Sequence, residues 1–190
     1  ISHDLKTPLT RINLMIEEID NDALQTSISK NISEMNLMLN HYLDFIKNEK
    51  NENFDEIETQ DFIKDLTLNY PKLNLTRNDS KIIIIRKNQI SRALVNILDN
   101  ANKFAEKIYM SSNISETKWV ITVEDDGPGT SLSQEELVKP FTKGSDQLNQ
   151  GTGLGLSIVQ KLIKLNNGEL RFEDSTYGGL KVLISLEINY

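Results

Sequence analysis

His3, Asp4 and Thr7, near the start of the sequence, form the first group with reactive side chains. An exposed neutral imidazole is a nucleophile toward a phosphoryl group, and an adjacent carboxylate can orient it and favour the tautomer with a free nitrogen. His3 lies two residues before Leu5, the first residue of an apolar helical seam, so we expect its ring to face solvent with Asp4 beside it. Thr7, one helical turn further on, could hold a water molecule on the same face, and Pro8 should bend the helix. Taken alone, these residues favour the plainer interpretation of a surface histidine beside a kink.

A second group lies in residues 96–104, where Asn96, Asn100 and Lys103 are spaced along one helical face. Amide oxygens coordinate hard cations and a lysine neutralises phosphate charge, so this face predicts a surface for magnesium and phosphate. The alternative is an ordinary polar helix face with solvated asparagines.

A third group, Asp125 to Gly129, directly follows the apolar residues 120–123, which suit a strand. Glycine permits a tight turn close to a ligand, and Asp125 at the strand end could accept a hydrogen bond from an exocyclic amine such as that of adenine. A plain β-turn explains the same residues at least as well.

The fourth group is the glycine-rich run Gly151-Thr152-Gly153-Leu154-Gly155, which immediately precedes a helical pattern. Glycine amides at a helix N-terminus predict a cradle for an anion such as a triphosphate. The run fits neither a dinucleotide-binding fingerprint nor a Walker sequence. Residues 130–150 before it are mostly polar, and we interpret them as a lid, with Phe141 either its anchor or simply a core residue.

Two apolar seams, spaced by alternating four and three residues, predict the helical hairpin that would carry His3. They consist of Leu5, Leu9, Ile12, Ile16 and Ile19, and of Ile28, Ile32, Met35, Leu39, Tyr42 and Ile46, with turn residues 20–22 between them. Such narrow seams bury little surface, so we expect a homodimer with a four-helix bundle. The first seam starts without a capping residue, and we expect its helix to begin upstream of Ile1.

The polar residues 47–53 predict a linker, which gives domains at 1–53 and 54–190. The second domain has an α/β pattern. We expect buried strands at 82–85 and 119–123, helices at 89–104 and 154–165, and further strands around 170–172 and 180–188.

Composition excludes several classes of function. The chain has 190 residues, 38% of them hydrophobic, a net charge of -7 and no cysteine. These values predict a folded, soluble protein without general affinity for nucleic acid, without disulfides and without a thiolate nucleophile. We expect no catalytic role for His41, the other histidine, because no carboxylate adjoins it.

In this order, the four groups resemble the H, N, G1 and G2 boxes of sensor histidine kinases, and residues 139–144 are similar to their F box. Residues 2–12 and 124–129 look especially like EnvZ-type osmosensor kinases. The resemblance implies an α+β fold, in which a dimerisation and histidine phosphotransfer hairpin precedes a Bergerat-type (GHKL) α/β sandwich that binds ATP.

The resemblance also assigns roles to individual residues. His3 would accept the phosphoryl group, Asp4 would be the assisting base, and Thr7 would position water during dephosphorylation of the partner. Asn100 would be the Mg²⁺ ligand and Asp125 the adenine acceptor. The remaining nucleotide-binding positions are Asn96, Lys103, Phe104, Gly127, Gly129, Gly151, Thr152, Gly153, Leu154 and Gly155. Two departures are Thr130, where an apolar residue is usual, and Phe104, where tyrosine is frequent.

The implied activity is ATP-dependent autophosphorylation, transfer to an aspartate of an OmpR-like receiver domain, and phosphatase activity toward that response regulator. The resemblance also implies that the chain is the cytoplasmic part of a bacterial inner-membrane protein, which upstream segments attach to the membrane. It further implies a hinge near Asn53. One alternative is a chaperone, topoisomerase or mismatch-repair ATPase of the same superfamily, but those lack the His3 hairpin. Another is a degenerate kinase that only dimerises and docks a regulator, against which Asn100, Asp125 and the glycines count.

Overall fold

The computed structural model describes residues 12, 15–16, 21–47, 52–142 and 153–188, and of residues 34 and 37–47 it describes the backbone alone. The chain divides into two compact units, Ile1–Asn51 and Glu52–Tyr190. In the described part, no helix combines the length and the apolar character that crossing a membrane requires.

The first unit contains the long helix α2 (Asp22–Lys47), of 26 residues. The Asn21 side chain caps it, since its Oδ1 accepts a hydrogen bond of 3.0 Å from the Leu24 N–H. Ile32 of α2 packs against Ile16, both are buried, and Ile28 is partly buried beside them. Met35, in the same predicted seam, is more than half exposed. Among the described side chains, burial in this seam is thus limited to the contact around Ile16 and Ile32, and the four-helix bundle stays a prediction.

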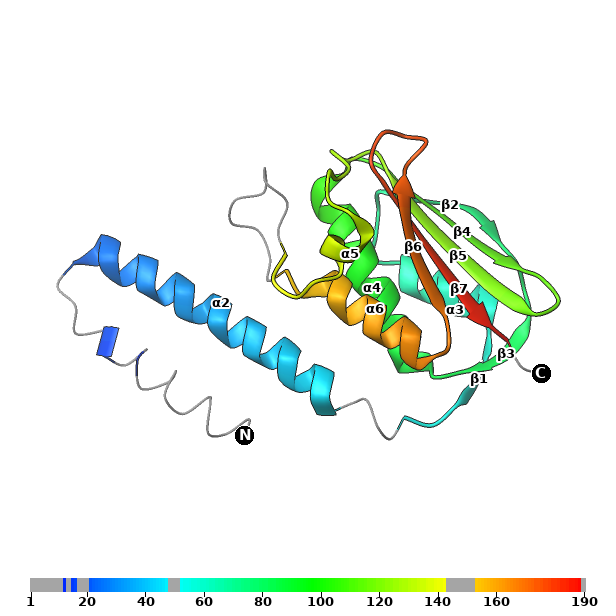
Figure 1. The fold of residues 1–190 in the computed structure, drawn as a ribbon, viewed down its shortest axis with the longest axis horizontal. Coiled ribbons are helices and arrows are strands. Elements are labelled where there is room, and N and C mark those ends of the chain that lie inside the picture. The colour runs from blue at the N-terminus through cyan, green and yellow to red at the C-terminus, as the bar shows by residue number, and fades with distance from the viewer. Residues whose placement is uncertain (1–11, 13–14, 17–20, 48–51, 143–152, 189–190) are drawn as a thin grey trace. The chain divides into compact units, whose positions relative to one another are not determined.

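The second unit is built on a five-stranded sheet with the order β2-β4-β5-β7-β6 (Figure 1). The strands are β2 (Leu73–Asn78), β4 (Ile108–Ile114), β5 (Lys118–Asp125), β6 (Glu169–Asp174) and β7 (Leu180–Glu187). The pair β2 and β4 is parallel, whereas the other neighbours are antiparallel. A separate antiparallel pair joins β1 (Asp55–Glu58) to β3 (Ile82–Ile85).

Helices cover one face of this sheet. They are α3 (Thr59–Thr67), α4 (Lys87–Phe104) and α6 (Gly155–Leu165), and α4 and α6 lie side by side across the strands (Figure 1). Along β5 every second residue from Trp119 to Asp125 is buried, as expected for a strand with one face against helices. Phe62 of α3 meets Trp119 edge to face, with ring centroids 5.9 Å apart. The unit is thus a two-layer α/β sandwich, as the sequence predicts.

Residues 82–85 form a strand, β3, as predicted, but only one of its two faces is buried. Ile83 and Ile85 are buried, but Ile82 is 60% and Ile84 44% exposed. The reason is that β3 pairs only with β1 and presents alternate side chains to an uncovered face. The structure also contains β1, α3, β2 and β4, which the pattern did not predict.

Candidate functional site

Asn96 and Asn100 lie on α4 where the first residue of α6 meets it. A Cβ atom added to Gly155 would lie 3.3 Å from Asn96 Oδ1 and 3.7 Å from Asn100 Nδ2, so only glycine permits so close an approach without adjustment. The Asn96 amide donates a 2.8 Å hydrogen bond to the Arg92 carbonyl. We call Asn96, Asn100 and Gly155 the helix-pair cluster. The structure therefore joins two of the predicted groups, which are far apart in sequence.

The packing of α4 fixes this cluster. The buried apolar stripe of α4 comprises Ile90, Ala93, Leu94, Ile97, Leu98 and Ala101. Asn96 and Asn100 flank this stripe and stay half-buried. At the C-terminus of α4, Lys72 donates to the carbonyls of Asn102 at 3.1 Å and Ala105 at 2.7 Å, which satisfies acceptors that the helix leaves open.

A buried tyrosine supports the same helix. The Tyr70 hydroxyl donates a 2.7 Å hydrogen bond to Asp99 Oδ1, in the turn that carries Asn100. Burial, followed by the hydrogen bond to this carboxylate, raises the pKa of Tyr70 well above its usual range. Tyr70 therefore remains a hydrogen-bond donor at any ordinary pH.

Lys103 occupies the rim of the site. Its side chain is exposed, and its Nζ lies 5.1 Å from the centroid of the Phe104 ring. The Phe104 carbonyl would lie 3.1 Å from a Cβ atom added to Gly127. The end of α4 thus lies against the turn that follows β5, and the predicted second and third groups also meet.

Asp125 is the last residue of β5 and is only 9% exposed. Its Oδ1 accepts hydrogen bonds from the backbone N–H of Gly127 at 2.9 Å and of Leu180 at 3.2 Å. Burial raises the pKa of Asp125, although these two hydrogen bonds act in the opposite direction. Both reach Oδ1, so within the described part of the chain Oδ2 keeps its acceptor capacity for a ligand. We call Asp125, Gly127, Gly129 and Leu180 the strand-end cluster.

Asp126, the next residue, has a different environment. Its Oδ1 accepts hydrogen bonds from the backbone N–H of Glu106 at 2.9 Å and of Lys107 at 2.8 Å. The Lys107 N–H is the main cause of the lowered pKa of this carboxyl. Asp126 therefore fastens the loop after α4 to the strand end, and Asp125 is the residue available to a ligand.

Gly129 and Gly153 both have a φ of +67°, in the left-handed region that favours glycine. The Gly153 carbonyl accepts a 2.9 Å hydrogen bond from the Phe141 N–H, so the segment before the glycine-rich run folds against its end. Leu154 is buried, and α6 begins at Gly155 without a side-chain cap. The first turn of α6 thus leaves amide groups without a side-chain cap, and their role as an anion cradle stays a prediction. Gly151 and Thr152 lie outside the described residues.

The predicted lid is described for residues 130–142. It contains the short helix α5 (Gln134–Leu137), which begins with a capping box between Ser133 and Glu136. Thr130 accepts a 3.1 Å hydrogen bond from the Leu132 N–H, so the unusual residue at this position stabilises a local turn. Phe141 is 62% exposed, and its interpretation as a core residue is wrong because its left-handed backbone turns the chain back onto Gly153.

The predicted residues His3, Asp4 and Thr7 lie outside the described residues. The backbone of His41 belongs to α2, but its side chain is not among those described.

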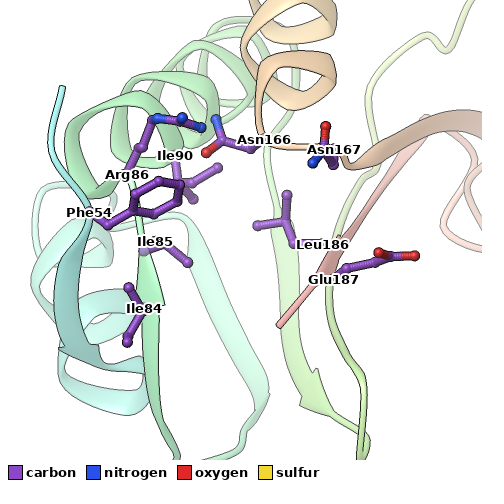
Figure 2. Close-up of a pocket in the computed structure, with 9 residues that line it drawn as sticks. All are labelled: Phe54, Ile84, Ile85, Arg86, Ile90, Asn166, Asn167, Leu186 and Glu187. Atoms are coloured by element: carbon purple, nitrogen blue, oxygen red, sulfur yellow. The ribbon is translucent and has the colours of Figure 1, made fainter. Parts of the chain in front are cut away.

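One pocket of the second unit, of about 110 Å³, contains none of the predicted site residues (Figure 2). It lies near the N-terminus of α4, whereas the Phe104 end of that helix meets the strand-end cluster. Figure 2 shows Arg86 beside Phe54, with the guanidinium carbon 4.2 Å from the ring centroid, and Arg86 also donates to the Leu165 carbonyl. These residues tie the first part of the unit to the end of α6.

Sequence reasoning missed the turn between β6 and β7. Leu180, which donates to Asp125, follows the pair Gly178-Gly179, a turn signal between two strand patterns. This pair could have indicated the hairpin, but the sequence gives no sign that the hairpin reaches Asp125.

Comparisons with known proteins show which family this chain resembles. Residues 85–189 match the family of histidine kinase-, DNA gyrase B- and HSP90-like ATPases. The sensor histidine kinase GtrS of Pseudomonas aeruginosa is 28% identical, over 98% of this chain and 40% of its own length. The sensor histidine kinase CpxA of Escherichia coli K12 is 29% identical, over 99% of this chain and 46% of its own length. The chain thus spans less than half the length of these curated relatives.

Solved structures show the same fold. The histidine kinase AdeS of Acinetobacter baumannii superposes with a TM-score of 0.67 at 23% identity, over 100% of both chains. Full-length ShkA in complex with AMPPNP gives a TM-score of 0.71 at 19% identity, over 98% of this chain and 44% of that one. The chain therefore belongs to the histidine kinase-, DNA gyrase B- and HSP90-like ATPase family, with a GHKL-type α/β ATP-binding domain.

Proposed function

We propose that this chain is the catalytic core of a sensor histidine kinase, which uses ATP to phosphorylate His3. The observation that carries the proposal is that one helix, α4, joins the helix-pair cluster to the strand-end cluster. It holds Asn96 and Asn100 against the start of α6, while its last residue, Phe104, lies against Gly127 beside the buried Asp125.

The strand-end cluster suits adenine. Asp125 has one carboxylate oxygen engaged by backbone N–H groups and the other available, and an ionised carboxylate accepts a hydrogen bond from an amine but not from a carbonyl oxygen. Gly127 lets the backbone of the turn approach closely. The nucleotide analogue named in the ShkA complex is consistent with such a ligand in this fold.

The helix-pair cluster suits the triphosphate and Mg²⁺. Asn100 would hold the cation through its amide oxygen, a donor type that hard cations prefer, with phosphate oxygens supplying further ligands. When bound, the cation would neutralise phosphate charge. Asn96, Lys103 and the amide groups at the start of α6 would bind phosphate oxygens, and Gly151 and Thr152 would complete the cradle.

Outside the described residues, the His3 ring would attack the γ-phosphorus in line, with Asp4 orienting it and ADP leaving.

We propose that residues 1–53 and 54–190 are the functional domains and that the linker near Asn53 is a hinge between them. Residues 1–53 would form a four-helix bundle in a homodimer. Phosphotransfer to a receiver-domain aspartate, dephosphorylation assisted by Thr7, and membrane attachment through upstream segments belong to the same proposal. Residues 2–12 and 124–129 favour an EnvZ-type kinase and an OmpR-like regulator.

The test is incubation with γ-labelled ATP and magnesium, followed by separation at alkaline pH, because phosphoramidates are labile in acid. We expect label on the unaltered chain and none on His3→Ala, while the ATP dissociation constant of that variant is unchanged. His41→Ala is the matched control and should keep its label. Label retained by His3→Ala would contradict the proposal.

A further inference from the structure

The turn between β6 and β7 contacts Asp125 twice. The Gly179 N–H donates to the Asp125 backbone carbonyl at 3.1 Å, and the Leu180 N–H donates to Asp125 Oδ1 at 3.2 Å. Of the two N–H groups on that oxygen, the Gly127 one belongs to the turn of Asp125 itself. The other comes from a hairpin 55 residues away along the chain. The direction of the Asp125 carboxylate therefore depends on where this hairpin lies.

The hairpin is in turn fastened to the strand that carries Asp125. Glu124 Oε2 accepts hydrogen bonds from the Thr176 N–H at 3.2 Å, from Thr176 Oγ1 at 3.1 Å and from Ser175 Oγ at 3.5 Å. Glu124 and Asp125 are successive residues of β5, so their side chains leave opposite faces of the sheet. The turn is thus held to β5 from both faces.

A pair of aromatic rings also holds the turn. The ring of Tyr177 stacks on that of Tyr109 in β4, with centroids 3.7 Å apart and planes inclined by 13°. Tyr109 lies opposite Glu124 in the pairing of β4 with β5. Tyr177 of the turn and the neighbouring strands β4 and β5 therefore form one connected support.

Gly179 is where this support touches Asp125 most closely. A Cβ atom added there would overlap Asp125 Oδ1 and lie 2.6 Å from the Gly127 nitrogen. Any side chain at this position would have to displace the carboxylate or the turn beside it. Close approach is therefore the physical requirement for glycine at position 179.

We propose that the hairpin turn of residues 175–180 positions Asp125, and that it thereby sets a preference for purine nucleotides with a 6-amino group over those with a 6-oxo group. Thr176, Tyr177 and Gly179 are positioning residues, which act through Asp125 without touching the base. This inference rests on the proposed function, because it assumes that Asp125 accepts a hydrogen bond from adenine. It predicts a change in selectivity, which a merely structural role of the hairpin would not produce.

The experiment measures dissociation constants of the full chain for ATP and for inosine triphosphate, which carries a carbonyl in place of the amine. The ratio of the inosine triphosphate constant to the ATP constant should fall about tenfold in Gly179→Ala, which displaces the carboxylate directly. It should fall severalfold in Thr176→Val, which removes one hydroxyl and keeps the shape of the side chain. Glu173→Gln is the matched control, since it breaks a partly exposed ion pair with Lys181 in the same hairpin and should leave the ratio unchanged.

Asp125→Asn distinguishes a failure of the proposed adenine contact from a failure of the proposed role of the hairpin. It should abolish the preference for ATP, because its amide can donate to the 6-oxo group. A preference retained by Asp125→Asn would overturn the proposed adenine contact and this inference with it. A preference lost in Asp125→Asn but kept in Gly179→Ala and Thr176→Val would overturn only the inference. If Gly179→Ala does not fold, Thr176→Val decides alone.

Discussion

The strand-end cluster and the helix-pair cluster are the two ends of one proposed site, but they are held in different ways. Asp125 is 9% exposed and receives backbone N–H groups from two separate segments of chain. Asn96 and Asn100 are half-buried side chains at the edge of α4, and Lys103 nearby is exposed. The difference indicates that the strand-end cluster, which would recognise a neutral base, is preorganised. The helix-pair cluster, which would bind the charged phosphates, stays accessible to solvent.

Electrostatics explains this division. A buried carboxylate loses hydration, and hydrogen bonds from backbone groups that are already fixed offset part of the cost. Adenine is uncharged, so it can occupy a partly dry site beside such a group. A triphosphate carries several charges that need cations and donors around them, and it must release one phosphoryl group, so its end of the site has to admit movement.

The largest effect is expected from a change at the helix-pair cluster. Asn100→Ala removes the proposed cation ligand. We expect the rate of autophosphorylation to fall on the order of a hundredfold, as is typical when an enzyme loses one group that stabilises charge in the transition state. The ratio of dissociation constants for inosine triphosphate and ATP should not change, because the strand end is untouched. Labelling rates and nucleotide titrations measure the two quantities.

Asn102→Ala is the control for Asn100→Ala, since residue 102 points away from the Asn96 and Asn100 row on α4. It should label at the normal rate. If Asn100→Ala were also autophosphorylated at the normal rate, the proposal that the helix-pair cluster binds the phosphates would be contradicted.

The helices of this site could be predicted because their apolar spacing is a local property. Residues 89–104 and 154–165 show the helical period, and the helices α4 and α6 occupy them. Asp125 could also be placed, since a β-branched run followed by glycine indicates a strand end. The approach of Gly155 to Asn96, in contrast, depends on how α4 packs against α6, which no local pattern specifies.

The strands β2 and β4 were not predicted because neither has a continuous apolar pattern. β2 is a largely exposed edge strand with Asn74, Thr76 and Arg77, so it lacks a continuous apolar signal. In β4, Ser112 occupies a fully buried position where an apolar residue is expected, because it accepts a 2.9 Å hydrogen bond from Trp119 Nε1. The exposure of Phe141 could not be predicted, because hydrophobicity alone does not show that its backbone adopts a left-handed turn.

A smaller effect should distinguish Gly153, beside the helix-pair cluster, from Gly129 in the strand-end cluster. Both have a φ of +67°, so alanine at either position costs about 1–2 kcal/mol of backbone strain. At Gly129 the nearest atom to an added Cβ would be 3.5 Å away, whereas at Gly153 the Phe141 carbonyl carbon would be 2.7 Å away. Gly153→Ala must therefore also shift residues 141 and 142.

We expect Gly153→Ala to weaken ATP binding severalfold more than Gly129→Ala, while the melting temperature falls in both. The two variants serve as controls for each other, because they share the chemical change and the backbone conformation. Equal losses of affinity would show that the segment ending at residue 142 does not support the phosphate end.

The smallest effect concerns Asp125 and Asp126, whose pKa values shift in opposite directions. The lowered pKa of Asp126 means that its ionised form stabilises the fold above the ordinary aspartate pKa, and that this stability is lost as the pH falls through the lowered value. The raised pKa of Asp125 means that the folded chain holds a proton more tightly than the unfolded one, so the contribution of Asp125 to stability declines as the pH rises through the raised value.

Asp126→Asn should slightly lower the melting temperature at neutral pH and have no effect in strong acid. Asp125→Asn should not lower it at neutral pH, because an amide oxygen can accept the same two N–H groups without a buried charge. Thermal melts of both variants from strong acid to neutral pH test this difference between Asp125 and Asp126. Changes in melting temperature of the same sign at neutral pH would contradict it. An Asp125→Asn variant at least as stable as the unaltered chain would show that folding does not require this carboxylate, which favours a role in binding a ligand.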